Sequence, residues 1–325
     1  MSWSIHRRRL LAAAAAGCAT GLRAQPRFPE RPVRVIVPYG VGIGPDVVMR
    51  AVADVLAARW RQPVLVDNKP GASGIVAFAE LRRVAPDGHT LFLADTATMC
   101  VNPLVHDSLP YDPARDLVPL TLLFHATFVI LVGGDSRFRS VPQLLDAARR
   151  EPGRISYGSL GNGHASQVAI ESLARAADVR LLHVPFKDAG ALFTAVAAGE
   201  VDFTAFGMNS VAGLLQRGRM RPLAVAARRR LADHPDLPTL AEVGAPDVPM
   251  HPWAGLVAPA GVPEPVLVQL QQDLVAAINA PEVRARVQPL GFDLTPSTPQ
   301  QFRQRIDADL ALYAPLVREG RVSRI

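Results

Sequence analysis

The chain has 325 residues, with 35 basic residues (Lys and Arg) against 29 acidic ones and a formal net charge of +6. Four of the basic residues and no acidic residue lie in the first 24 positions, which leaves 31 basic against 29 acidic residues for the rest, so nucleic acid is not expected as a partner. An apolar content of 49% with 20% charged residues excludes a disordered chain and predicts one large or two medium domains.

The first 24 residues have the pattern of an export signal. Arg7, Arg8 and Arg9 precede an apolar run, Leu10–Ala16, and Ala24 is a small residue suited to cleavage. This run is much shorter than the ~20 residues of a membrane span. We therefore expect residues 1–24 to be removed and the mature protein to be periplasmic. The adjacent arginines also permit a twin-arginine signal, whereas the lipoprotein-like sequence before Cys18 is a weaker match.

Short apolar strand candidates alternate with helical stretches along the rest of the chain. The predicted strands are Val33–Val37, Pro63–Val66, Thr90–Ala94, Thr127–Val132, Ile155–Tyr157, Leu181–Val184, Val201–Thr204, Pro222–Ala227 and Trp253–Val257. The predicted helices are Pro45–Trp60, Ile75–Val84, Val141–Arg150, His164–Ala177, Ala191–Ala198, Pro265–Asn279 and Pro299–Val317. This order predicts an α/β fold with mixed, mainly parallel sheets flanked by helices.

The pattern restarts near residue 127 and again near residue 253, which predicts two lobes joined by a double hinge. The expected lobes are 25–126 plus 253–325, and 127–252, with a ligand cleft between them. In such sheets, ligands bind beyond the carboxyl ends of the strands. The loops of interest are Pro38–Asp46, Asp67–Gly74, Ala94–Asn102, Ser159–Ser166 and Pro185–Ala191.

Two of these loops suit an anion. Tyr39–Asp46 contains Gly40, Gly42 and Gly44 directly before a helix, where backbone N–H groups can approach a negative charge. A dinucleotide site with Asp67 as the ribose-binding acid is an alternative, but the spacing is GxGxG and not GxGxxG. A plain strand-to-helix turn is the other alternative.

Ser159–Ser166 is the chemically richest loop. Ser159, Asn162 and Ser166 offer hydroxyl and amide groups, while Gly161 and Gly163 leave the backbone N–H groups open at a helix start. That combination suits a carboxylate. Lys69, in the Asp67–Gly74 loop, could add a positive charge.

Sequence signatures of catalysis and metal binding are absent. No GxSxG, HExxH or CxxC motif occurs, and the histidines are dispersed without the spacing of metal ligands. Cys100 is the single cysteine after the predicted signal, so no intrachain disulfide is expected. We therefore expect a protein that is not an enzyme and needs neither a metal nor a cofactor.

Several segments, taken together and in order, resemble one family. They are Phe28-Pro29-Glu30-Arg31-Pro32-Val33, Asp67-Asn68-Lys69-Pro70-Gly71-Ala72, Ala85-Pro86-Asp87-Gly88-His89-Thr90, Leu109-Pro110-Tyr111-Asp112-Pro113, Tyr157-Gly158-Ser159-Leu160-Gly161-Asn162-Gly163, His183-Val184-Pro185-Phe186-Lys187, Ala198-Gly199-Glu200-Val201-Asp202, Leu237-Pro238-Thr239-Leu240-Ala241-Glu242 and Ala258-Pro259-Ala260-Gly261-Val262-Pro263. From about Phe28 to Gly320, the chain resembles the periplasmic solute receptors of tripartite tricarboxylate transporters, also called Bug receptors.

The resemblance implies a two-lobed periplasmic binding protein of type II-like fold that closes on a small organic acid and hands it to a membrane permease. It implies that the carboxylate is held by two loops, through Tyr39, Gly42, Asp46, Ser159, Gly161, Asn162 and Ser166. Our candidates for the distal part of the ligand are Phe186, Phe206, Met208 and Asn209. A receptor that opens and closes is expected to be monomeric.

The chain departs from the family pattern at several positions. Its first loop reads Gly40-Val41-Gly42-Ile43-Gly44, and Asp188 and Ala191 replace a usual glycine and proline. The acid that pairs with an amine in amino-acid-binding members is replaced by Phe206 or Gly207. We therefore hypothesise a carboxylate with an apolar or hydroxylated remainder, not an α-amino acid. The alternatives are a ligand-sensing partner of a signalling system and an exported nucleotide-dependent oxidoreductase.

Overall fold

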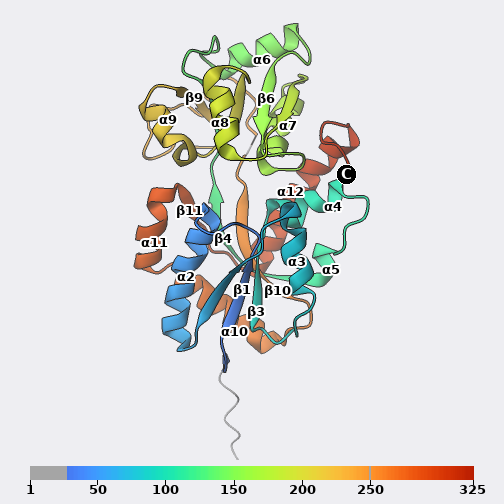
Figure 1. Cartoon of the computed structure of the whole chain (residues 1–325), viewed down its shortest axis with the longest axis vertical. Helices are drawn as coiled ribbons and strands as arrows, with labels where there is room; N and C mark the ends of the chain where they lie inside the picture. Colours follow the sequence, from blue (N-terminus) through green and yellow to red (C-terminus); the bar gives the residue numbers. More distant parts are fainter. Residues whose placement is uncertain (1–27, 249) are drawn as a thin grey trace, which may run out of the picture.

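The computed structural model describes residues 28–248 and 250–325, so the predicted export signal at positions 1–24 lies outside the described residues. Two β-sheets, each covered by helices, follow one another along the long axis of the molecule (Figure 1). We call the lower sheet in the figure and its helices lobe 1, and the upper sheet and its helices lobe 2.

Lobe 1 contains a six-stranded sheet in the order β11-β4-β10-β3-β1-β2. Its strands are β1 (Val33–Val37), β2 (Val64–Asn68), β3 (Thr90–Asp95), β4 (Leu117–Ala126), β10 (Trp253–Pro259) and β11 (Phe292–Leu294). Its α-helices are α2 (Gly44–Trp60), α3 (Ile75–Leu81), α4 (Asn102–Val105), α5 (Pro113–Asp116), α10 (Glu264–Ile278), α11 (Pro281–Val287) and α12 (Pro299–Arg318). Short helical turns occur at η1 (Ala72–Gly74), η2 (Ala97–Val101) and η4 (Gln288–Leu290).

Lobe 2 contains a five-stranded sheet in the order β7-β6-β8-β5-β9. Its strands are β5 (Val129–Gly133), β6 (Ser156–Ser159), β7 (Leu182–Pro185), β8 (Phe203–Phe206) and β9 (Met220–Val225). Its helices are α6 (Val141–Arg150), α7 (Ala165–Ala176), α8 (Ala189–Ala198), the turn η3 (Met208–Val211) and α9 (Ala212–Gln216).

The central strands are apolar because both faces of each sheet are covered. Val35 of β1 is fully buried in one hydrophobic cluster with Leu56 of α2. The next residue, Ile36, is fully buried in a second cluster with Phe302 of α12. Successive residues of a strand point to opposite faces, so a continuous apolar run is what a sheet between two helix layers requires.

Both sheets are mixed, as the sequence predicted. The strands β1, β2 and β3 pair in parallel, as do β6, β7 and β8. β10 is antiparallel to its neighbours β3 and β4, and β5 is antiparallel to β8 and β9. β5 and β10 are the first strands after the chain has entered a lobe from the other one, which is why they run against the local direction.

The chain passes between the lobes twice. The first passage lies between the end of β4 at Ala126 and the start of β5 at Val129, and the second between β9 and the start of β10 at Trp253. We propose that the lobes divide at 126/127 and 252/253. Within the described ranges, no helix is long and apolar enough to cross a membrane.

The strands β4 and β11 and the helix α11 were not predicted. β4 contains Pro119 near its start, and proline is disfavoured inside a strand because it cannot donate to the ladder. β11 has three residues, too few for a recognisable alternation. Both strands matter, since they bring side chains to the space between the lobes.

Candidate functional site

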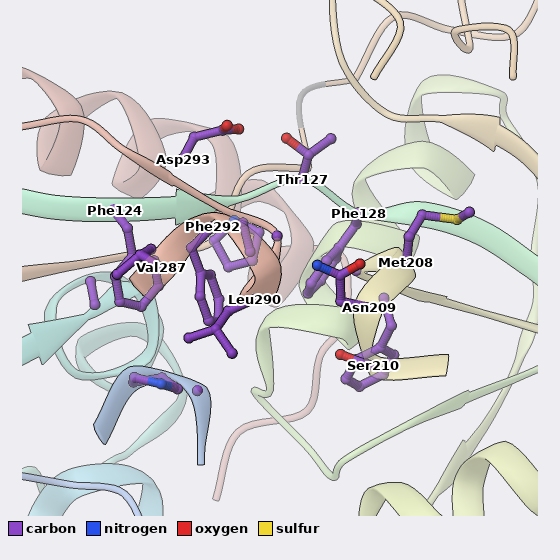
Figure 2. A pocket seen from close by; sticks show the side chains of 18 of the residues that line it. Phe124, Thr127, Phe128, Met208, Asn209, Ser210, Val287, Leu290, Phe292 and Asp293 are labelled. Atoms are coloured by element: carbon purple, nitrogen blue, oxygen red, sulfur yellow. The ribbon is translucent and has the colours of Figure 1, made fainter. Parts of the chain in front are cut away.

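A cleft of about 1100 Å³ lies between the two lobes. Figure 2 shows Phe124, Val287, Leu290 and Phe292 on one side of it, with Phe128, Met208, Asn209 and Ser210 on the other. Lobe 1 also contributes Tyr39, Ile43, Gly44, Trp253 and Asp293, and lobe 2 also contributes Leu160, His164, Ala165, Phe193 and Phe206.

Aromatic rings form much of the cleft wall. Phe124 and Phe292 pack with their ring centroids 4.3 Å apart, and Phe128 stacks on Phe206 at 5.5 Å. Phe193 meets Phe206 edge to face at 5.2 Å. The rings pack against one another within each lobe, so both walls of the cleft present a preformed apolar surface to a ligand.

A smaller cavity of about 180 Å³ adjoins the cleft. The two spaces share the lining residues Tyr39, His164, Ala165, Pro252 and Trp253. The small cavity is also lined by the loops 71–74 and 95–97. Its polar lining residues include Ser73, Asp95 and Thr96.

Tyr39 lines both spaces, but its hydroxyl is already engaged. The hydroxyl donates a hydrogen bond to Oδ2 of Asp95, which also accepts from the backbone N–H of Thr98 at its Oδ1. Burial raises the pKa of the Asp95 carboxyl, while these hydrogen bonds act in the opposite direction. The tyrosine ring and the oxygen lone pairs are the parts of Tyr39 left for a ligand.

Gly42 and Asp46 form an internal bond of their own loop. The Gly42 N–H donates to Asp46 Oδ2 at 2.8 Å, and Asp46 also accepts from Arg50 Nε at 3.0 Å and from Asn68 Nδ2 at 2.8 Å. Burial alone would raise the pKa of Asp46, but the hydrogen bonds from Arg50, Gly42 and Asn68 outweigh it and lower the pKa. Neither Gly42 nor Asp46 lines the cleft or the small cavity.

The predicted Ser159–Ser166 loop reaches the cleft, although through other residues than those expected. Ser159 is fully buried and lies 2.6 Å from His183 Nε2, and Ser166 is also fully buried. Asn162 Nδ2 donates to the carbonyl of Ser323 at 2.8 Å. The residues of this loop region that line the cleft are Leu160, His164 and Ala165, whereas Ser159, Gly161, Asn162 and Ser166 do not.

Of the four candidates for the distal part of the ligand, three line the cleft and one does not. Phe206, Met208 and Asn209 line the cleft. Phe186 does not, because its ring packs against the backbone of β6, where a Cβ on Gly158 would come within 3.2 Å of it.

Sequence reasoning missed His164, Asp293 and the phenylalanines of β4 and β11. His164 directly precedes α7 and caps it, a position at which histidine is not a usual signal. Phe124 and Phe292 lie far apart in the chain, and their contact depends on the pairing of β4 with β11. In the described ranges, no group of three or more His, Cys, Asp or Glu side chains is placed to hold a metal ion.

Residues 48–321 match the family described as Tripartite tricarboxylate transporter family receptor. The chain belongs to this receptor family. A relative from Pseudomonas sp. (strain P51), the UPF0065 protein in the tcbD-tcbE intergenic region, is 33% identical over 324 residues, which cover 98% of this chain and 96% of the relative. Membership in the tripartite tricarboxylate transporter receptor family confirms the resemblance found in the sequence.

Solved structures agree with this assignment. R. palustris Rpa4515 with adipate has a TM-score of 0.80 and 26% identity, covering 92% of this chain and 100% of that chain. MatC from Rhodopseudomonas palustris with bound malate has a TM-score of 0.75 and 28% identity, covering 89% of this chain and 99% of that chain. The two-lobed periplasmic binding protein fold is thereby confirmed, and the family is one of solute receptors.

Proposed function

We propose that this receptor captures a small organic carboxylate in the cleft and hands it to the permease of a tripartite tricarboxylate transporter in the periplasm. The observation that carries the proposal is the cleft itself, which takes its lining from both lobes and lies beside the two passages between them. Family membership and the adipate and malate of the two similar structures support it. Closure of the lobes then excludes water from the bound acid and strengthens its hydrogen bonds.

The carboxylate is received at two helix starts. Gly44 at the start of α2 and Ala165 at the start of α7 both line the cleft, and Ile43 provides no side-chain cap to α2. The partial positive charge of a helix N-terminus stabilises an anion by roughly 0.3–1 kcal/mol. Tyr39 and Phe206 contact the ligand directly. The other residues expected from the sequence keep the surrounding loops in shape: Gly42, Asp46, Ser159, Gly161, Asn162, Ser166 and Phe186.

The remainder of the ligand is apolar. A group the size of a phenyl ring would bury about 150 Å² against the phenylalanine wall, which contributes roughly 4 kcal/mol. An amine has no acidic partner at the expected place, because β8 ends at Phe206 and is followed by Gly207. Of the two acids among the described residues that line the cleft, Asp293 pairs with His125 at 3.2 Å, and Asp233 belongs to the loop after β9 and not to the segment after β8. A carboxylate without an α-amino group therefore fits best.

Native mass spectrometry of the protein, exported by its host and purified without refolding, tests this function. We expect the mass of a single chain that begins at Gln25. We also expect a bound small acid, which collisional activation releases. Calorimetry with adipate, malate, benzoate and phenylacetate, against glutamate and aspartate as amino controls, then ranks the ligand classes. Tight binding of glutamate or aspartate would contradict the non-amino assignment, and no binding of any acid would contradict the carboxylate receptor.

A further inference from the structure

His164 stands where the cleft and the small cavity meet. It is the residue directly before α7, and it lines both spaces. Its ring lies nearly parallel to that of Phe206, with the centroids 6.0 Å apart and an interplanar angle of 19°. The imidazole is thus held by an aromatic neighbour and by the first turn of a helix, at a residue that lines both spaces.

The hydrogen bonds of His164 determine which ring nitrogen carries the proton. The backbone N–H of Ser166 donates to Nδ1 at 3.1 Å, and the Ser166 hydroxyl lies 2.8 Å from the same atom. A backbone N–H can only donate, so Nδ1 must present its lone pair. In the neutral ring the proton is then on Nε2, which points away from the helix start.

The surroundings keep this ring neutral. Burial lowers the pKa of His164 to about 4. The other titratable groups that line the small cavity are Tyr39 and Asp95, which are hydrogen-bonded to each other. Protonation of His164 at Nδ1 would break the capping bond to Ser166, which also opposes the charged form. At neutral pH the ring therefore offers one fixed N–H donor.

We propose that the Nε2–H of His164 donates a hydrogen bond to a carboxylate oxygen of the ligand at the junction of the two cavities and so determines that the ligand presents an acceptor there. This inference rests on the proposed function. The helix start fixes the tautomer, and the stacked Phe206 fixes the ring plane, so the donor is in place before the ligand arrives. An ammonium group at the same point would leave two donors facing each other in a closed cleft, which is unfavourable.

Two substitutions separate the donor role from the capping role. His164→Ser keeps a good N-cap but removes the donor, because the serine side chain is too short to reach the position of Nε2. His164→Gln places an amide N–H near that position but is a poor N-cap. The ligand probe is whichever of adipate, malate, benzoate and phenylacetate binds the wild-type chain most tightly. His106→Ser, at a histidine that lines neither the cleft nor the small cavity, is the matched control.

We expect His164→Ser to raise Kd at least tenfold with little change in Tm, and His164→Gln to stay within about threefold of the wild-type Kd with a lower Tm. The control should bind like the wild type. Wild-type affinity in His164→Ser, or equal weakening in both His164 variants, would overturn the inference while leaving the receptor function intact. Failure of all four acids to bind the wild type would instead remove the proposed function and this inference with it.

Nitrogen-15 NMR of the histidine side chains provides an independent readout. We expect His164 in the free protein at pH 7 to be neutral with its proton on Nε2, and this proton to shift and exchange more slowly when the acid binds. A proton on Nδ1, or an Nε2 proton indifferent to a bound acid, would overturn the inference.

Discussion

Individual side chains at the passages between the lobes have surroundings that the sequence does not reveal. His251 lies just before β10, with its ring centroid 5.4 Å from that of His125 and its Nδ1 3.3 Å from the Thr127 hydroxyl. Burial, the neighbouring His125 and Arg305 lower the pKa of His251 to about 4, although Asp293 acts in the opposite direction. Histidine at this position is therefore neutral in the folded protein at neutral pH.

The depressed pKa of His251 predicts a loss of stability in acid. An unfolded histidine has a pKa near 6.5, so between about pH 6.5 and 4 the unfolded chain binds more protons, and stability falls as the pH falls. Going from pH 8 to 4.5 should remove roughly 2–3 kcal/mol through this group. The variant His251→Asn has no group that titrates in this range, so its free energy of unfolding should fall correspondingly less between pH 8 and 4.5. Urea unfolding at the two pH values measures this difference. Identical losses in the variant and the wild type would contradict this.

At the scale of elements, the start of α2 is positioned by close packing against β11. Gly44 is the first residue of α2, and a Cβ added to it would lie 2.6 Å from the ring of Phe292. In the sequence, the glycines of this loop suggested an anion site, with a dinucleotide site or a plain turn as alternatives. In the structure, the last of them allows a helix and an aromatic ring of the cleft wall to come together.

Gly44→Ala should displace the Phe292 ring and weaken ligand binding. Overpacking of this kind typically costs about 1–3 kcal/mol. Thermal unfolding should show a lower Tm for the variant, and calorimetry should show that the acid binds at least about tenfold more weakly. Gly213→Ala in α9 is the control, since a Cβ there meets only the Arg217 side chain at 3.6 Å, and it should be neutral or slightly stabilising. Unchanged affinity in Gly44→Ala would mean that the Phe292 ring is not part of the binding surface.

At the scale of the whole molecule, hydrogen bonds between the lobes flank the cleft. On one side, Asn209 Nδ2 of lobe 2 donates to the carbonyl of Pro289 in lobe 1 at 3.0 Å. On another side, the segment after α12 meets α7 and its neighbouring loops: Arg321 Nη1 donates to the carbonyl of Val179 at 3.0 Å, and Arg175 pairs with Glu319 at 2.8 Å. These bonds hold the two lobes in the arrangement that the structure shows.

Asn209→Ala should shift the free receptor toward an open form. A single hydrogen bond contributes about 1 kcal/mol, which changes an open-to-closed ratio about fivefold. Small-angle X-ray scattering without any acid present should show a larger radius of gyration than in the wild type. Asn279→Ala, which removes a bond to Arg284 within lobe 1, should leave scattering unchanged. If both variants scatter like the wild type, the Asn209 bond does not hold the lobes together.

Much of the fold could be read from local patterns. The strand Val33–Val37 and the helix Val141–Arg150 occur in the structure with the predicted bounds. The prediction was incomplete where a proline or a very short length hid the pattern, as in β4 and β11. The site was predicted less well: the two loops lie at the cleft, but Asp46 and Ser159 are directed into their own loops and not toward a ligand.

The sequence by itself determined the elements, their order and the family of this chain, because apolar periodicity, turn residues and ordered motifs are local properties. Only the tertiary structure decided which side chains form the cleft. Phe124 and Phe292 become neighbours through strand pairing, and His164 becomes a fixed donor through a backbone N–H of α7 and a ring from β8. Such partners are chosen by long-range packing and hydrogen bonding, which no local pattern records.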